Sequence, residues 1–155
     1  MNIKKSIMWS IALASLSFGS LQAADVSVSV DKNAVILNGY DAVAYFTKSS
    51  AVKGSQNYTA VHNNSIYQFS SAKNRDTFNK NPEKYAPQYG GFCAYGAALG
   101  KKFEVDGKAF EVVDNKLYVN KNAEVYEIWD KEEAKNIKTA DKKWVDIKDK
   151  AASSL

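Results

Sequence analysis

The chain has 155 residues, one cysteine, one histidine and a formal net charge of +4. A single cysteine excludes an intramolecular disulfide, and two Cys and His side chains in total exclude a four-ligand zinc site within one chain. The lysines are scattered from Lys32 to Lys150 and give no concentrated basic surface, so we expect no nucleic-acid partner.

The N-terminus has the pattern of a secretory signal peptide. Lys4 and Lys5 precede an apolar run over 7–18, and the small residues of "SLQAAD" follow it. We therefore expect a signal peptide at 1–23, cut after Ala23, and export to a bacterial periplasm. The run is too short to cross a bilayer, and no later segment is apolar enough, so we expect no membrane span in the mature chain.

The mature chain is long enough for one domain and too short for two ordinary ones. We expect an N-terminal leader at 24–37, a domain at 38–147 and a C-terminal tail at 148–155. Within the leader, "DVSVSVD" alternates apolar and polar residues and fits either a short strand or a loosely ordered segment. No internal repeat is visible in the sequence.

The first half of the domain is expected to hold a hairpin and a helix. The stretch 34–46 predicts an extended entry, since it combines a β-branched run with a turn dipeptide. The runs 58–62 and 65–69 flank Asn63-Asn64, which tolerates the positive φ of a tight turn, so they predict a β-hairpin. Ser71 is placed to cap a helix that ends near Pro82.

The second half is expected to begin with a Gly-Gly bend and a short helix from near Cys93 to Gly100. The stretch 101–120 predicts two or three strands, with turns at Asp106-Gly107 and Asp114-Asn115. From Ala123 onward, apolar residues at helical intervals predict one or two amphipathic helices, with a break near Thr139. Hairpins mixed with helices at irregular intervals favour an α+β fold class.

Several blocks carry a family resemblance. The segments "YDAVAYF", "IYQFSSAKNRDTFNKNPEKY" and "PQYGGFCAYGAALGKKFEVD", followed by "KLYVN", resemble the exported single-domain branch of the YHS-domain family. The resemblance covers 38–147. It implies a small α+β module of β-hairpins with interspersed short helices and a C-terminal helical segment, and it implies metal-handling proteins as candidate partners.

The resemblance also implies three metal-binding cysteines that this chain lacks. In the metal-associated members of the family, cysteines occupy the positions that are Ala44, Ser70 and Asn74 in this sequence. The family scaffold is therefore matched and its usual metal ligands are not. The thiol that remains is Cys93, in a block that belongs to the exported branch.

Cys93 and His62 are the candidate metal ligands. If a helix begins near Cys93, the helix N-terminus lowers the pKa of the thiol, and a soft thiolate selects Cu(I), with one imidazole completing a low-coordinate site. We therefore predict an exported copper-handling module that uses Cys93 and His62. The alternative is a structural or protein-interaction domain, a monomer or weak homodimer, in which Cys93 is a buried, inert small side chain.

An enzyme is the least favoured class. A Cys-His nucleophilic pair is numerically available, but no orienting motif, phosphate loop or pair of acids appears at a telling spacing. A thiol oxidoreductase would need a second, resolving cysteine, which the sequence lacks. The tyrosines that gather around Cys93 are explained by packing, with a tyrosine-lined small-molecule pocket as the alternative.

Overall fold

A computed structural model of the chain describes residues 26–155. The expected signal peptide at 1–23 lies outside the described residues, as do the first two residues of the leader. The described chain is α+β, as predicted: helices are combined with two separate antiparallel hairpins. Across 26–155 no helix is both long enough and apolar enough to cross a membrane.

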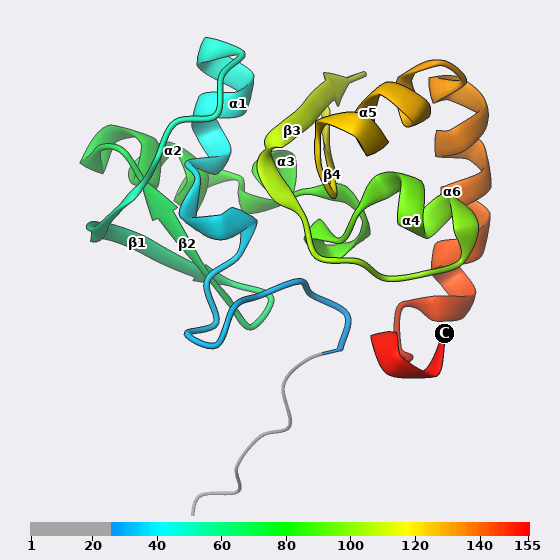
Figure 1. Ribbon diagram of the computed structural model, residues 1–155. Helices are drawn as coiled ribbons and strands as arrows, with labels where there is room; N and C mark the ends of the chain where they lie inside the picture. Colours follow the sequence, from blue (N-terminus) through cyan, green and yellow to red (C-terminus); the bar gives the residue numbers. More distant parts are fainter. Residues whose placement is uncertain (1–25) are drawn as a thin grey trace, which may run out of the picture.

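The first half of the domain runs from a 3₁₀ turn to two helices that follow a hairpin (Figure 1). Its elements are η1 (Leu37–Gly39), α1 (Ala42–Lys48), β1 (Ser55–His62), β2 (Ser65–Phe69), α2 (Ala72–Lys80) and α3 (Pro82–Tyr85). The predicted hairpin is confirmed, and both Asn63 and Asn64 have positive φ. Ser71 caps α2 as predicted, since its side chain accepts the N–H of Asn74.

The second half repeats that order. Its elements are η2 (Gln88–Gly91), α4 (Ala94–Leu99), β3 (Asp106–Val113), β4 (Lys116–Asn120), α5 (Ala123–Asp130), α6 (Glu133–Ile147) and η3 (Ala152–Ser154). The predicted bend and short helix are confirmed: Gly90 and Gly91 have positive φ, and α4 ends at Gly100 in the left-handed conformation.

Three local predictions are wrong. The stretch 34–46 is not extended throughout, because Asp41 caps a helix there and its side chain accepts two main-chain N–H groups. Asp106-Gly107 is not a turn but the start of β3, where Gly107 lies against Tyr40 in a space with no room for a side chain. The C-terminal break falls between α5 and α6, and α6 runs through Thr139.

An internal repeat that the sequence does not display is clear in the structure. Each half has the order 3₁₀ turn, short helix, hairpin, capped helix, further helix. The two hairpins share one register and one irregularity: Ser55 pairs with Phe69 in β1–β2, and Asp106 pairs with Asn120 in β3–β4, both pairs shifted by 51 positions. We call residues 37–85 the first unit and 88–147 the second unit.

An equivalent aromatic pair in each unit supports the correspondence of the two units. Tyr67 on β2 packs on Phe78 of α2 with ring centroids 4.5 Å apart. In the second unit Tyr118 on β4 packs on Trp129 of α5 with centroids 5.7 Å apart. Both residues of the second pair again lie 51 positions beyond their counterparts. Figure 1 shows the two units side by side, with β1, β2, α1 and α2 in one half of the molecule.

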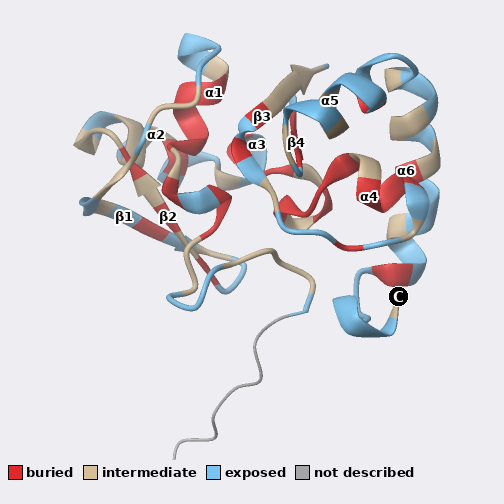
Figure 2. Ribbon diagram, viewed as in Figure 1, coloured by how far each residue is buried: buried red, intermediate tan, exposed pale blue. Residues whose placement is uncertain are grey.

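Strand β4 joins the two units, because its alternate residues belong to different cores. Leu117 and Val119 lie in the core cluster that also holds Phe69 and Phe78. Tyr118, between them, lies in the cluster of the second unit. A strand presents successive side chains to opposite faces, so β4 is buried on both. Figure 2 shows the buried segments converging on α1, β4 and α4.

Lys102 ties both ends of the described chain to the second unit. Its ammonium donates to the carbonyl oxygens of Val26, Lys148 and Lys150 at 2.6, 2.7 and 2.7 Å. The expected leader also contributes to the core, since Ile36 and Leu37 are fully buried. The leader and the tail are therefore packed parts of the domain over the residues described.

Candidate functional site

Cys93 is the N-cap residue of α4 and is only 1% exposed. Its Sγ accepts the N–H of Gly96 at 3.4 Å, and its S–H donates to Oδ1 of Asn120 at 3.5 Å. The bend at Gly90 and Gly91 comes just before Cys93 and turns the chain into the start of α4. The thiol is therefore held at the start of a helix, as the sequence predicted, but inside the protein.

Burial decides the protonation of this thiol. Removal from water raises the pKa of Cys93, while nearby main-chain N–H groups and the charge of Lys121 lower it by less. The expectation that the helix N-terminus would lower the pKa of Cys93 is therefore wrong in its net direction. At neutral pH the side chain is a thiol, and a thiol is a poor metal ligand and a poor nucleophile.

His62 ends β1 and lies in the first unit. Its Nε2 is 3.1 Å from Oε1 of Glu83 and 3.0 Å from Nδ2 of Asn63. Its ring packs edge-on against Phe78 with centroids 6.0 Å apart, and its side chain is 14% exposed. This histidine is thus a partly covered residue that supports the end of the hairpin.

The predicted Cys93/His62 pair is not assembled in residues 26–155. No hydrogen bond joins Cys93 to His62, and the two side chains have no bonding partner in common. The Cys-His nucleophilic pair considered from the sequence likewise has no hydrogen bond between its members in these residues. Over the same described range, one group of three candidate ligands comes together, and it is acidic: Glu111, Asp130 and Glu133. It includes neither predicted ligand.

The positions of the three missing cysteines do meet, around a buried carboxylate. Asp41 is 0% exposed. Its Oδ1 accepts the N–H groups of Val43 and Ala44 at 2.9 and 3.2 Å. Its Oδ2 accepts the N–H and the hydroxyl of Ser70 at 2.8 and 2.6 Å, and Nδ2 of Asn74 at 2.7 Å. The place where the family resemblance implies a metal is filled here by a complete hydrogen-bond network.

No structural role was assigned to Asp41 from the sequence. A local signal for its role exists, because Asp followed by a run of helix-compatible residues is an N-cap pattern. The contacts from Ser70 and Asn74, 29 and 33 positions away, have no such signal. Asp41 therefore joins the start of α1, the end of β2 and the first turn of α2.

A cleft of about 350 Å³ opens where the hairpin of the first unit faces α6. Tyr67 and Trp144 supply aromatic walls, and Asn64 and Gln88 supply amide groups. Glu83 and Lys148 place opposite charges on its lining. Pockets between packed units, with aromatic walls and a few polar groups, are the usual form of small-molecule sites.

Two of the tyrosine hydroxyls in this part of the chain, those of Tyr45 and Tyr89, form hydrogen bonds within the protein. That of Tyr45 donates to the carbonyl oxygen of Gly107 at 2.7 Å, across the two units. That of Tyr89 donates to Oδ1 of Asp141 at 2.9 Å, which links η2 to α6. Burial raises the pKa of both phenols. These contacts support the packing explanation for the tyrosines around Cys93.

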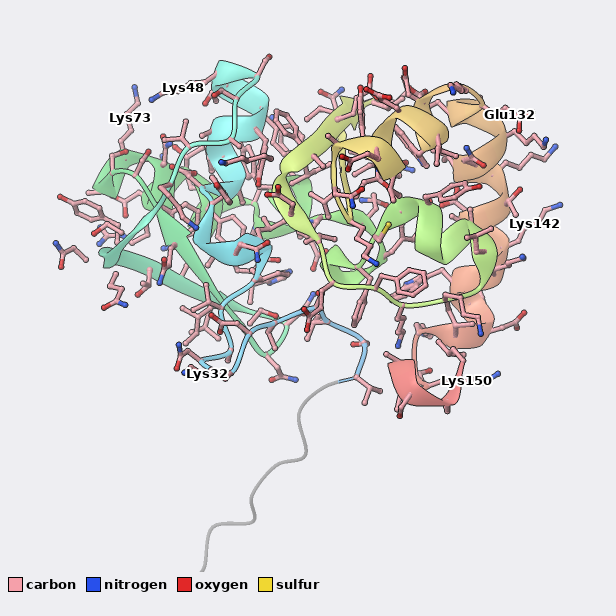
Figure 3. All side chains as sticks on the ribbon, in the orientation of Figure 1. Lys32, Lys48, Lys73, Glu132, Lys142 and Lys150 are labelled. Carbon is pink, nitrogen blue, oxygen red and sulfur yellow. The ribbon has the colours of Figure 1, made fainter. Side chains whose placement is uncertain are left out.

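Charge is spread over the molecule. Figure 3 shows Lys48 and Lys73 together at one end and Lys142 and Lys150 on the other side. Their side chains point outward from different elements, which matches the scattered lysines of the sequence. The described surface therefore has no single concentrated basic face.

Comparison with known proteins adds no assignment. No family model matches the chain, and neither a curated protein nor a solved structure matches it.

Proposed function

We propose that this chain is a non-catalytic structural or interaction domain, related to the exported YHS domains, in which Cys93 is a structural residue. The observation that carries the proposal is the state of the thiol. It is buried, it is protonated, and it has a hydrogen-bond donor in Gly96 and an acceptor in Asn120. A side chain in that state caps a helix and fills space.

Copper handling by Cys93 and His62 remains a prediction that competes with this proposal. Cu(I) binding at Cys93 would require loss of the bond to Asn120, deprotonation of the thiol and movement of a second ligand toward it. Each of these steps costs free energy, and binding to a preformed site would not require them. Nothing in the geometry of residues 26–155 favours such a site.

Thiol labelling and copper titration separate the two functions. We expect native Cys93 to resist a bulky maleimide until the protein is unfolded in urea, and Cu(I) under reducing conditions to bind wild type and Cys93→Ser equally. Rapid native labelling that Cu(I) blocks, with lower copper stoichiometry in both Cys93→Ser and His62→Ala, would overturn the proposal and establish the metal module.

The cleft favours a second candidate function, the binding of a small molecule. Opposite charges from Glu83 and Lys148 beside the rings of Tyr67 and Trp144 suit a zwitterion with an apolar side chain, such as an amino acid or dipeptide. The emission of Trp144 gives a signal for titration with a panel of free amino acids and dipeptides. We expect a saturable change in wild type that Ala86→Trp, which fills the cleft, abolishes. No saturable change with any member of the panel would rule this candidate out.

A further inference from the structure

Cys93 occupies the position in the second unit that the buried carboxylate of Asp41 occupies in the first, because η2 is one residue longer than η1 and the two short helices are therefore offset by 52 positions, one more than the hairpins. Each is the N-cap residue of the short helix that precedes the hairpin. Each is fully buried. The carboxylate of Asp41 is held by three main-chain N–H groups, those of Val43, Ala44 and Ser70.

The same three donors are present around Cys93. The repeat places Tyr95, Gly96 and Lys121 where the first unit has its three donors. The N–H of Gly96 lies 3.4 Å from the sulfur. Hydrogen bonding from the main chain of all three residues favours the anionic form of Cys93. We call the main-chain N–H groups of Tyr95, Gly96 and Lys121 the cradle. In the first unit the equivalent N–H groups bind both oxygens of a carboxylate, whereas the side chain of Cys93 has no oxygen.

The side-chain amide of Asn120 has a donor without an acceptor beside Cys93. Asn120 is fully buried, and its Oδ1 accepts from Cys93 at 3.5 Å and from the N–H of Tyr95 at 3.1 Å. Its Nδ2 has no hydrogen-bond partner. In the first unit the side-chain amide of Asn74 donates to the carboxylate of Asp41 at 2.7 Å. A buried amide donor beside the thiol is thus free to serve an anion at this place.

We propose that Cys93 is an oxidation site for hydroperoxides, and that its sulfinate is held by the cradle that in the first unit holds the carboxylate of Asp41. A sulfinate carries two oxygens on the γ atom, as the aspartate carboxylate does. The amide of Asn120 and the main-chain N–H groups of Gly96 and Lys121 supply donors to those oxygens, while the N–H of Tyr95 stays bonded to Oδ1 of Asn120. The positive charge of Lys121 favours the product. This inference goes beyond the proposed function and does not depend on it.

The chemistry balances with two equivalents of hydroperoxide. The thiol first loses its proton; the resulting thiolate attacks a peroxide oxygen, an S–O bond forms as the O–O bond breaks, and the departing alkoxide or hydroxide takes up the proton to become an alcohol or water. Each such step oxidises the sulfur by two electrons and reduces one peroxide. The second step gives the sulfinic acid, which releases a proton to become the sulfinate.

Phe103 packs beside the segment that holds the sulfur. Its ring lies against Gly96, where an added Cβ would come within 2.8 Å of it, and its carbonyl oxygen accepts the N–H of Cys93 at 3.0 Å. Phe103 is 40% exposed, and the ammonium of Lys121 lies 5.4 Å from the centre of its ring. Because Cys93 is only 1% exposed, any reagent reaches the sulfur through local opening, and a bulky maleimide needs a larger opening than a small peroxide. Oxidation is therefore slow and selective for size.

Two isosteric substitutions test the cradle without any oxidant. Cys93→Asp supplies the two oxygens and the charge, and Cys93→Asn supplies the same shape without the charge. We expect Cys93→Asp to melt roughly 4 °C or more above Cys93→Asn at pH 7. In an ordinary apolar site the order is reversed, because a buried charge costs more than a buried amide. An aspartate variant that melts below the asparagine variant, or that fails to fold, would refute the cradle.

Peroxide treatment of the full-length protein tests the modification itself. The chain has three sulfur side chains, and Met1 and Met8 lie in a separate N-terminal peptide, so peptide mass mapping assigns oxidation to Cys93 directly. We expect hydrogen peroxide to add two oxygens at Cys93 with Tm unchanged or higher, and Phe103→Ala to accelerate the addition several-fold. A sulfinate that lowers Tm, or oxidation of Cys93 only in urea, would overturn the proposal.

Discussion

Asp41→Ala is expected to lower the stability of the protein strongly. It removes the acceptor of five hydrogen bonds. The side chains of Ser70 and Asn74 can turn to other partners, but the main-chain N–H groups of Val43 and Ser70 are left buried without the carboxylate. An unsatisfied buried donor costs about 1–3 kcal/mol, and loss of an N-cap costs about 1 kcal/mol. We expect a loss of about 3–5 kcal/mol in the free energy of unfolding.

Asp31→Ala is the matched control. Asp31 also accepts two main-chain N–H groups, at 2.8 and 2.9 Å, but it is exposed, and water replaces the lost acceptor. We expect a loss below about 1 kcal/mol. Urea unfolding followed by far-UV circular dichroism measures both variants, with the slope against denaturant checked for constancy. Equal losses in Asp41→Ala and Asp31→Ala would refute the claim that burial makes the Asp41 network dominant.

Gly90, Lys102 and Tyr118 each give a further prediction. Gly90→Ala should lower Tm more than Gly100→Ala, because a Cβ at Gly90 overlaps a main-chain oxygen of the leader, whereas at Gly100 the nearest atom is 3.6 Å away. Lys102→Met should speed amide hydrogen exchange over 148–155, since two carbonyls there lose their donor. Burial raises the pKa of Tyr118 to about 12. Its contribution to stability, complete below pH of about 10, should fade as pH rises toward 12, as measured by urea unfolding at each pH.

Each of these outcomes has a clear contrary result. Equal Tm losses in the two glycine variants would show that the left-handed conformation, and not contact with the leader, sets the cost. Unchanged exchange over 148–155 would mean that the tail is held by other contacts. Stability that stays constant to pH 12 would mean that Tyr118 ionises equally in the folded and unfolded protein.

The hairpins were predictable because the residue types at their turns are those that favour tight turns. Asn63-Asn64 and Asp114-Asn115 all adopt positive φ, and Asn and Asp are the non-glycine residues that tolerate it best. The α+β class followed from those turns and the helical spacing. Helix α1 was missed because its β-branched and aromatic residues favour strands, while the capping contacts of Asp41 decide the outcome.

The environment of Cys93 was only partly predictable. Local sequence placed it correctly at the start of a helix, which depends on the glycines just before it. Its burial and its contact with Asn120, 27 positions away, depend on packing that no local pattern encodes. The repeat was hidden for a similar reason, because the two units share a register and a set of positions, with few identical residues such as Tyr67 and Tyr118.

The double burial of β4 bears on how the protein loses its structure. A two-stranded hairpin is marginally stable in water, so each hairpin depends on the helices and strands packed against it. Since Leu117 and Val119 belong to one core and Tyr118 to the other, melting of either unit exposes one face of β4. Once one unit has unfolded, the other unit is not expected to remain folded by itself. We therefore expect all-or-none unfolding, in which one shared strand makes the two repeated units a single cooperative block.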